Sequence, residues 1–399
     1  MGTATRSVAQ TAREQAAAHL PAIVRDITAL VETETSSYDP AALRTGSFHV
    51  ATLAGRLCGP PAREHRHPGG EYGDMLTLTW PGTAPGRVLI LAHYDTVWPT
   101  GTLATWPVTA SRDADGREVL TGPGIFDMKA GLVQSLWALR LLQQSGAATP
   151  TVTLFLNGDE ELGSPVSRPL IEELAVLADA VLVAEPSAGG AVKTGRKGVG
   201  FFRVDVVGIE AHAGLDPEAG ASAIHAIAEV ITQVTRISDL SKGTSINVGL
   251  VDGGSGANVA AGRATAVVDI RVQDPAEQER VDRAFDAVTV SDPRVKVTIG
   301  HHWNRPPMFP NEASAPLVGV LREVAHELGY ELQEAFVGGA SDANFVAGLG
   351  RPVVCGLGAV GAGPHARTEF IYADAIPTQV ALTAGALGRL AHGLPLLTA

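Results

Sequence analysis

The sequence predicts an α/β protein in which a mostly parallel sheet flanked by helices is interrupted by a smaller α+β domain. Short apolar runs of strand type alternate with helical patterns at both ends of the chain, as in a parallel sheet with helices on its faces. After about residue 196 the order becomes strand, helix, strand, strand, helix, strand, which is a ferredoxin-like unit. We therefore expect one domain made of residues 1–196 and 306–399, with a second domain inserted at 197–305.

The elements of the larger domain follow from apolar spacing. Residues 8–33 have helical spacing and predict an opening helix, and Asp39-Pro40 predicts a turn. Alternating or continuous apolar runs predict strands at 75–80, 88–92, 151–156, 178–184 and 352–357. Helical periodicity predicts further helices at 131–143, 315–328 and 375–394.

The inserted domain has its own set of predicted elements. Strands are expected at 200–207, 245–251, 264–272 and 295–299. Helices are expected at 217–236, which is rich in Ala and Ile, and at 275–287, which is charged. These elements complete the ferredoxin-like order.

Composition limits the function classes. Of 399 residues, 45% are hydrophobic and 18% charged, enough to bury a core. The net charge of −12 and the lack of a Lys/Arg-rich run argue against a nucleic-acid binder. No apolar run approaches the roughly 20 residues that span a bilayer. Cys58 and Cys355 are too few for a disulfide framework or a four-thiolate zinc site. We expect a cytoplasmic protein without nucleic-acid or membrane partners.

A histidine and an aspartate follow the apolar run at 88–92. In an extended chain the side chains of His93 and Asp95 point to the same side. Asp95 can therefore reach one imidazole nitrogen and leave the other free, which is the usual support for a metal-binding histidine.

Other carboxylates and a second histidine stand in similar places. Asp127 lies in a turn-rich segment, Glu160 and Glu161 follow one predicted strand, Glu185 follows another, and His365 comes late in the chain after Gly-Pro. Adjacent Glu160 and Glu161 cannot both point the same way, so one can bind a metal while the other moves protons. Because ligands gather at the carboxyl ends of parallel strands, these residues predict a metal centre.

Five segments carry a resemblance to a known family. In chain order they read HYDTVWP, GPGIFDMKAG, NGDEELGS, AEPS and GPHARTEF. The sequence resembles the zinc-dependent peptidase and deacylase family of glutamate carboxypeptidase, acetylornithine deacetylase, succinyl-diaminopimelate desuccinylase, aminoacylase and carnosinase-type dipeptidases. It is most similar to the glutamate carboxypeptidase branch. The resemblance covers nearly the whole chain and specifies the superfamily far better than the substrate.

The resemblance implies a site with two divalent ions, Zn²⁺ or alternatively Co²⁺ or Mn²⁺. It implies that Asp127 bridges the two ions, that His93 and Glu185 complete the ligands of one ion, and that Glu161 and His365 complete those of the other. It also implies that Glu160 is the general base and that Asp95 is the partner of His93. Such a pair of ions polarises a carbonyl and acidifies a bridging water. Met128 stands where relatives often carry a second acidic residue.

The resemblance also assigns residues of the inserted domain. His212, in GIEAHAG, would stabilise the oxyanion in the active site of a partner subunit, which implies a homodimer formed through this domain. Asn258 and Arg271 would hold the substrate near its carboxylate, and Arg305 would grip the free α-carboxylate. The guanidinium fork suits a carboxylate better than an ammonium does.

Several polar residues are interpreted as surface groups. His65 and His67 have metal-like spacing but are expected in a polar loop. The pair His301-His302 and the cations Lys193 and Arg196 could approach a substrate, although solvated side chains are the simpler interpretation.

The leading functional hypothesis is a di-metal hydrolase that cleaves the amide of an N-acyl amino acid or peptide next to a free C-terminal carboxylate. A second hypothesis is deacylation of a biosynthetic N-acyl amino acid, which differs only in what fills the acyl side of the pocket. A third, from another class, is a non-catalytic metal-binding paralogue, which the intact Glu160 and all five ligands argue against.

Overall fold

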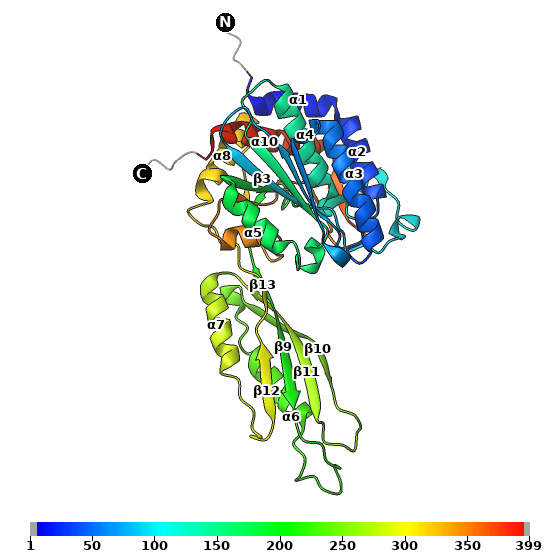
Figure 1. Cartoon of the computed structure of the whole chain (residues 1–399), viewed down its shortest axis with the longest axis vertical. Helices are drawn as coiled ribbons and strands as arrows, with labels where there is room; N and C mark the ends of the chain where they lie inside the picture. Colours follow the sequence, from blue (N-terminus) through cyan, green and yellow to red (C-terminus); the bar gives the residue numbers. More distant parts are fainter. Residues whose placement is uncertain (1–5, 395–399) are drawn as a thin grey trace. The chain divides into compact units, whose positions relative to one another are not determined.

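The computed structural model describes residues 6–394 and divides the chain into two compact units (Figure 1). The first unit contains residues up to Thr194, Pro310–Phe336 and the chain from Phe345 onward. The second contains Gly195–Phe309 together with Val337–Asn344. The short segment 337–344 thus packs with the second unit, although it follows the insertion by almost thirty residues of first-unit chain.

A six-stranded mixed sheet forms the centre of the first unit. Its strands are, in spatial order, β1 (Arg63–His67), β2 (Met75–Trp80), β6 (Thr151–Asn157), β3 (Arg87–His93), β7 (Ala180–Val183) and β15 (Val353–Val354). The four strands β6, β3, β7 and β15 run parallel, and β1 and β2 are antiparallel additions at one edge. The predicted parallel sheet is therefore confirmed.

Helices cover both faces of this sheet. They are α1 (Val8–Ala18), α2 (Leu20–Glu32), α3 (Pro40–Cys58), α4 (Ala130–Gln144), α5 (Arg168–Leu177), α8 (Ala315–Glu327) and α10 (Ile376–Arg389). The short helix α9 (Ala343–Gly348) has its first two residues in the second unit and the rest in the first. The chain passes from β3 through α4 to β6, and returns from β6 through α5 to β7 on the other side of β3. Because both crossovers of a parallel sheet are right-handed, α4 and α5 lie on opposite faces, as Figure 1 shows.

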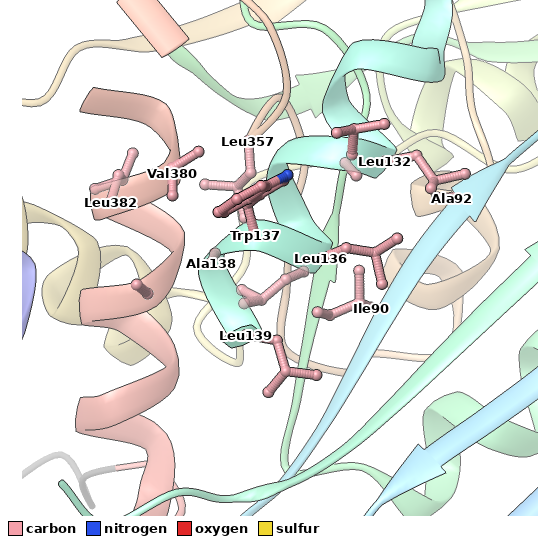
Figure 2. Close-up of a cluster of buried hydrophobic side chains, with 14 of the residues drawn as sticks. Ile90, Ala92, Leu132, Leu136, Trp137, Ala138, Leu139, Leu357, Val380 and Leu382 are labelled. Atoms are coloured by element: carbon pink, nitrogen blue, oxygen red, sulfur yellow. The ribbon is translucent and has the colours of Figure 1, made fainter. Parts of the chain in front are cut away.

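The core of the first unit lies between α4, α10 and the central strand β3. Figure 2 shows Ile90 of β3, Leu136 and Trp137 of α4, and Val380 of α10 in this cluster, and each is at least 96% buried. Burying side chains of this size stabilises the fold by about 1.5–3 kcal/mol each. Gly131 is required in α4, because a Cβ there would lie 1.9 Å from the carbonyl oxygen of Ala184.

A second sheet of the first unit was not expected from the sequence. Its order is β16 (Gly361–Ala362), β17 (Phe370–Tyr372), β5 (Glu118–Thr121) and β4 (Thr109–Arg112), all antiparallel. A separate strand pair is formed by β8 (Val192–Arg196) and β14 (Glu334–Val337). Strands of two to five residues are too short to show a periodic pattern, which is why these were missed.

The second unit has the predicted ferredoxin-like fold. Its antiparallel sheet has the order β10 (Ser245–Gly253), β11 (Arg263–Val272), β9 (Gly198–Val207) and β12 (Lys296–Gly300), and β13 (Trp303–Arg305) pairs with the start of β9. The helices are α6 (Ala223–Thr235) and α7 (Pro275–Asp286). A core separate from that of the first unit includes Phe202, Val230, Ile270 and Phe285.

Some elements differ from the prediction. The single helix expected at 8–33 is two helices, because the chain breaks at His19 and Pro21 starts the first turn of α2. The Asp39-Pro40 pair begins α3 instead of forming a turn, with the Asp39 carboxylate accepting the N–H groups of Ala41 and Ala42.

The remaining differences concern polar segments. His65 and His67 lie on β1, an edge strand whose polar side chains are typical of sheet edges, and not in a loop. The helix expected from residue 217 begins at Ala223, since the preceding residues form turns. Within residues 6–394, every helix is too short or too polar to cross a lipid bilayer.

Candidate metal centre

Three neighbouring strands of the first unit deliver polar side chains to one edge of the sheet. His93 is the last residue of β3 and pairs in register with Asn157, the last residue of β6. Glu160 and Glu161 start the short helix η4 (Glu160–Leu162) that follows β6, and Glu185 lies just beyond β7. The side chains that the sequence placed after separate strands therefore come together because the strand ends are adjacent.

Asp127 lies between two histidines. Its Oδ1 is 3.3 Å from His93 Nε2, and its Oδ2 is 3.5 Å from His365 Nε2. A further carboxylate accompanies each ring, since Glu185 Oε1 is 3.6 Å from His93 Nε2 and Glu161 Oε2 is 3.0 Å from His365 Nε2. The arrangement is two histidine-carboxylate pairs that share one aspartate.

These spacings fit divalent metal ions. Nitrogen and oxygen ligands at about 2.0–2.1 Å from a tetrahedral ion lie about 3.3 Å from one another. Two groups have ligand atoms within 4.8 Å of one another: His93, Glu160 and Glu185, and His93, Asp127 and Glu161. Buried His93 Nε2 and Glu161 Oε1 have no hydrogen-bond partner among the described residues, as expected of atoms that face an ion.

The electrostatics of the cluster also favour cations. Burial alone would lower the pKa of His93, but contacts with Asp127, Asp95 and Glu185 outweigh it and raise the pKa well above its ordinary value. Contacts with Asp127 and Glu161 raise the pKa of His365 to about 11. The surplus of carboxylates therefore favours positive charge, and the two imidazole rings would have to give up their protons to bind a divalent ion here.

The carboxyl groups of Glu161 and Asp127 have pKa values shifted in opposite directions. Burial raises the pKa of Glu161 to about 7, against the opposing contact with His365. Burial also acts to raise the pKa of Asp127, yet contacts with His365 and His93 prevail and lower it. Asp127 is thus the carboxylate that the histidines keep ionised.

Asp95 contacts the His93 ring, as the sequence predicted. His93 Nδ1 donates to the carbonyl oxygen of Asp95 at 3.1 Å, and the Asp95 carboxylate Oδ1 is 3.4 Å from the same nitrogen. Asp95 Oδ2 accepts hydrogen bonds from Ser37 Oγ at 2.8 Å and from the backbone N–H of Glu161 at 3.2 Å. Asp95 therefore links the histidine of one pair to the chain that carries the carboxylate of the other.

The loop that carries Asp127 has an unusual backbone. It follows Gly124, whose φ is +71°, and the peptide bond between Asp127 and Met128 is cis. His365 has a φ of +61°, a left-handed conformation that residues with a Cβ adopt only when their surroundings hold them.

The predicted residues of the second unit lie at two ends of its sheet. Arg271 and Arg305 both pair in register with Val199, near the start of β9, and β13 marks this end in Figure 1. His212 and Asn258 lie beyond the other end, where the backbone N–H of Ala213 donates to the carbonyl oxygen of Asn258. Eight residues of β9 separate the two ends, which corresponds to about 26 Å.

Each end has defined polar contacts. The exposed His212 accepts, at Nδ1, the backbone N–H groups of Gly214 and Leu215 at 3.2 and 3.1 Å, so the neutral ring carries its hydrogen on Nε2. Arg271 makes two hydrogen bonds to Asp269 at 2.9 and 2.8 Å. The buried Arg305 donates to Asp342 at 2.9 Å.

Comparison with known proteins identifies the family. Residues 89–389 match the model of Peptidase family M20/M25/M40. The chain belongs to this family. It is 31% identical to Carboxypeptidase G2 of a Pseudomonas species, over 94% of this chain and 90% of that protein. It is 29% identical to a succinyl-diaminopimelate desuccinylase of Variovorax paradoxus, over 74% of this chain and 80% of that protein.

Solved structures of other proteins share the fold. Aminopeptidase PepT from Bacillus cereus has a TM-score of 0.76 at 20% identity, covering 93% of this chain and 99% of that one. An M20 metallo-carboxypeptidase from Sulfolobus solfataricus has a TM-score of 0.71 at 18% identity, covering 92% and 99%. The predicted family and enzyme class are confirmed: this M20 chain is a hydrolase of the metallopeptidase type.

Three buried residues around this M20 site were not found from the sequence. Ser37 holds Asp95, as described above. Burial lowers the pKa of Lys129 to about 7, and its Nζ donates to the carbonyl oxygen of Thr33 at 2.8 Å. Burial raises the pKa of Glu369 to about 7, although three backbone N–H groups oppose the shift. Lys129 lies in the segment GPGIFDMKAG and Glu369 in the segment GPHARTEF. Their place in two of the five segments that carry the family resemblance was the only feature of the sequence that pointed to them.

Proposed function

We propose that this M20 hydrolase uses two divalent ions to cleave the amide bond of an N-acyl amino acid or peptide next to a free C-terminal carboxylate. The position of Asp127, with one oxygen facing each of two histidines, carries the proposal. The similarity to Carboxypeptidase G2 over nearly the whole chain supports the carboxypeptidase reaction.

His93, Asp127 and Glu185 would hold one ion, and Asp127, Glu161 and His365 the other. Imidazole and carboxylate donors without a thiolate suit Zn²⁺, with Co²⁺ or Mn²⁺ as alternatives. When bound, the ions supply polarisation of the amide carbonyl and a more acidic water.

Glu160 would be the general base. It is 8% exposed, and one of its carboxylate oxygens can lie within 4.8 Å of His93 and Glu185 ligand atoms. A carboxylate there can take the proton of the attacking water and then deliver it to the nitrogen of the leaving amine. Its closeness to His93 and Glu185 also permits it to act as a ligand, so the variant that removes its charge has to be examined for metal content as well.

The two arginines at one end of the second unit would bind the substrate carboxylate. Arg305 is buried and already oriented by Asp342, so its guanidinium loses little freedom when it binds. Arg271 lies on the same row of the sheet, on the other side of Val199. Paired guanidinium groups in one row can grip both oxygens of a carboxylate.

We propose further that the enzyme acts as a homodimer. A dipeptide spans at most about 7 Å, whereas the ends that carry Arg305 and His212 are about 26 Å apart within one rigid sheet. One small substrate therefore cannot contact both residues of the same chain. His212, with Asn258 beside it, would serve a second chain, where its Nε2–H can donate to the oxyanion.

Deacylation of a biosynthetic N-acyl amino acid is the second candidate, favoured by the desuccinylase relatives. Both reactions are tested by stripping the protein with chelator, restoring Zn²⁺, Co²⁺ or Mn²⁺, and measuring amino acid released from acyl amino acids, folate-like glutamates and dipeptides. Metal-dependent release from glutamates or dipeptides supports the carboxypeptidase reaction. Release from acetyl or succinyl amino acids alone supports deacylation, and two bound ions without any release would mean a non-catalytic paralogue.

A further inference from the structure

A buried carboxylate outside the proposed ligand set holds the loop that carries Asp127. Glu369 is fully buried. Its Oε1 accepts the backbone N–H groups of Phe126 at 2.8 Å and Asp127 at 3.0 Å. Its Oε2 accepts the backbone N–H of Gly124 at 3.1 Å and the indole Nε1–H of Trp98 at 3.1 Å. Four N–H donors therefore converge on this one side chain.

These donors come from segments that also present the metal-centre residues. Trp98 follows Asp95 by three residues, and Gly124 and Phe126 precede Asp127. Glu369 itself lies four residues after His365, in a turn where its own backbone N–H donates to the carbonyl oxygen of Ala366. A single carboxylate thus connects three chain segments that are far apart in the sequence and adjacent at the site.

The chemistry of the four contacts requires two acceptor oxygens. A carboxylate accepts at both oxygens, whereas the amide of glutamine accepts at one and donates at the other. An amide would therefore turn its NH₂ group toward two N–H donors, whichever way it is oriented. An amide at position 369 would therefore lose two of the four hydrogen bonds and leave buried N–H groups without an acceptor, which frees the loop.

From these contacts we propose that Glu369 is a positioning residue that keeps the Asp127 carboxylate between His93 and His365. The proposal rests on the metal centre of the proposed function. Asp127 must face both rings at once, at 3.3 and 3.5 Å, and its backbone N–H is one of the four groups that Glu369 binds. Groups that orient metal ligands typically contribute 10–100-fold to metal affinity.

The test uses the full chain, stripped with chelator and titrated with Co²⁺ against a chromophoric chelator. Stoichiometry, affinity and the visible Co²⁺ spectrum are measured for wild type, E369Q, W98F and D374N. Asp374 is the matched control, because it is a half-exposed acid five residues along the same segment whose contact is with Arg117. Thermal unfolding of the stripped proteins reports folding separately from metal binding.

We expect E369Q to bind Co²⁺ about 10–100-fold more weakly than wild type and with an altered spectrum, whereas D374N matches wild type. W98F removes one hydrogen-bond donor and leaves the carboxylate, so we expect a smaller loss of Co²⁺ affinity than in E369Q. If E369Q does not fold, W98F is used to test the proposal in its place. Wild-type affinity and spectrum in folded E369Q, or in W98F where E369Q is unfolded, would overturn the role of Glu369. A wild-type chain that binds no Co²⁺ would overturn the metal centre itself.

Discussion

The two units carry their polar residues in opposite ways. In the first unit, residues from five chain segments converge on one edge of a sheet, and Asp127 makes contacts on both sides. In the second unit, the two pairs of candidate residues lie about 26 Å apart at the ends of one sheet. The first arrangement can form a complete metal centre within one chain. Under the proposed function, the second would contribute only part of a substrate site to any one centre.

This difference leads to separate expectations for the two units. Changes in the first unit should damage chemistry or metal binding in the chain that carries them. Under the proposed function, changes at the end of the second unit that carries His212 should damage the site of a partner chain. The predictions below test this division, from the largest expected effect to the smallest.

The substitution E160Q should have the largest effect. Removing the base is expected to lower kcat by about 10²–10⁴-fold, because an amide cannot take the proton of the attacking water. Metal content, measured on the same sample, should remain at two ions per chain. E172Q, which alters a surface acid paired with Arg168, is the control and should keep full activity. An active E160Q would place the base elsewhere, and a loss of one ion would make Glu160 a ligand.

The substitution H212A should lower kcat by about 10²–10³-fold, as expected when one donor to an oxyanion is removed. Mixing H212A with E160Q should restore part of the activity. In a mixed dimer, the intact Glu160 of one chain is completed by the intact His212 of the other. If mixed dimers are demonstrated and no activity returns, His212 does not act in the active site of a partner chain.

The substitution R305K should act on substrate binding. It keeps the charge beside Asp342 but loses the planar fork, so KM should rise about 10-fold for substrates with a free C-terminal carboxylate. The matching C-terminal amides should be affected much less. R203K, on an exposed arginine paired with Asp205, is the control. An equal rise of KM for acids and amides would show that Arg305 does not hold the carboxylate.

The smallest effects concern helix caps in the two units. Asp39 caps α3 in the first unit, and Asp274 caps α7 in the second by accepting the N–H of Glu277. D39A and D274A should each lower the free energy of unfolding by about 0.5–2 kcal/mol. Because the two cores are separate clusters, calorimetry should show each change in the unfolding of its own unit. A shift of a single common transition by both variants would mean that the units unfold together.

Much of the fold could be predicted because the apolar runs and the alternation of apolar and polar residues indicate strands and helices directly. The buried runs that became β3, β6 and β7 are continuous and apolar, and the ferredoxin-like order followed from alternation in β9 and β11. The antiparallel sheet of β4, β5, β16 and β17 was missed because its strands are two to four residues long. The long helix α3 was missed because its start looked like a turn.

The sequence by itself determined which residues stand at the ends of the buried strands and, by resemblance, their family and their expected partners. Tertiary structure alone decided that Asp127 faces two rings, that Ser37 holds Asp95, and that Glu369 binds a loop 242 residues away. It also decided that His212 and Arg305 lie at opposite ends of one sheet. The physical reason is that periodicity records only which face a side chain takes within its own element. Contacts between distant segments depend on how those elements pack.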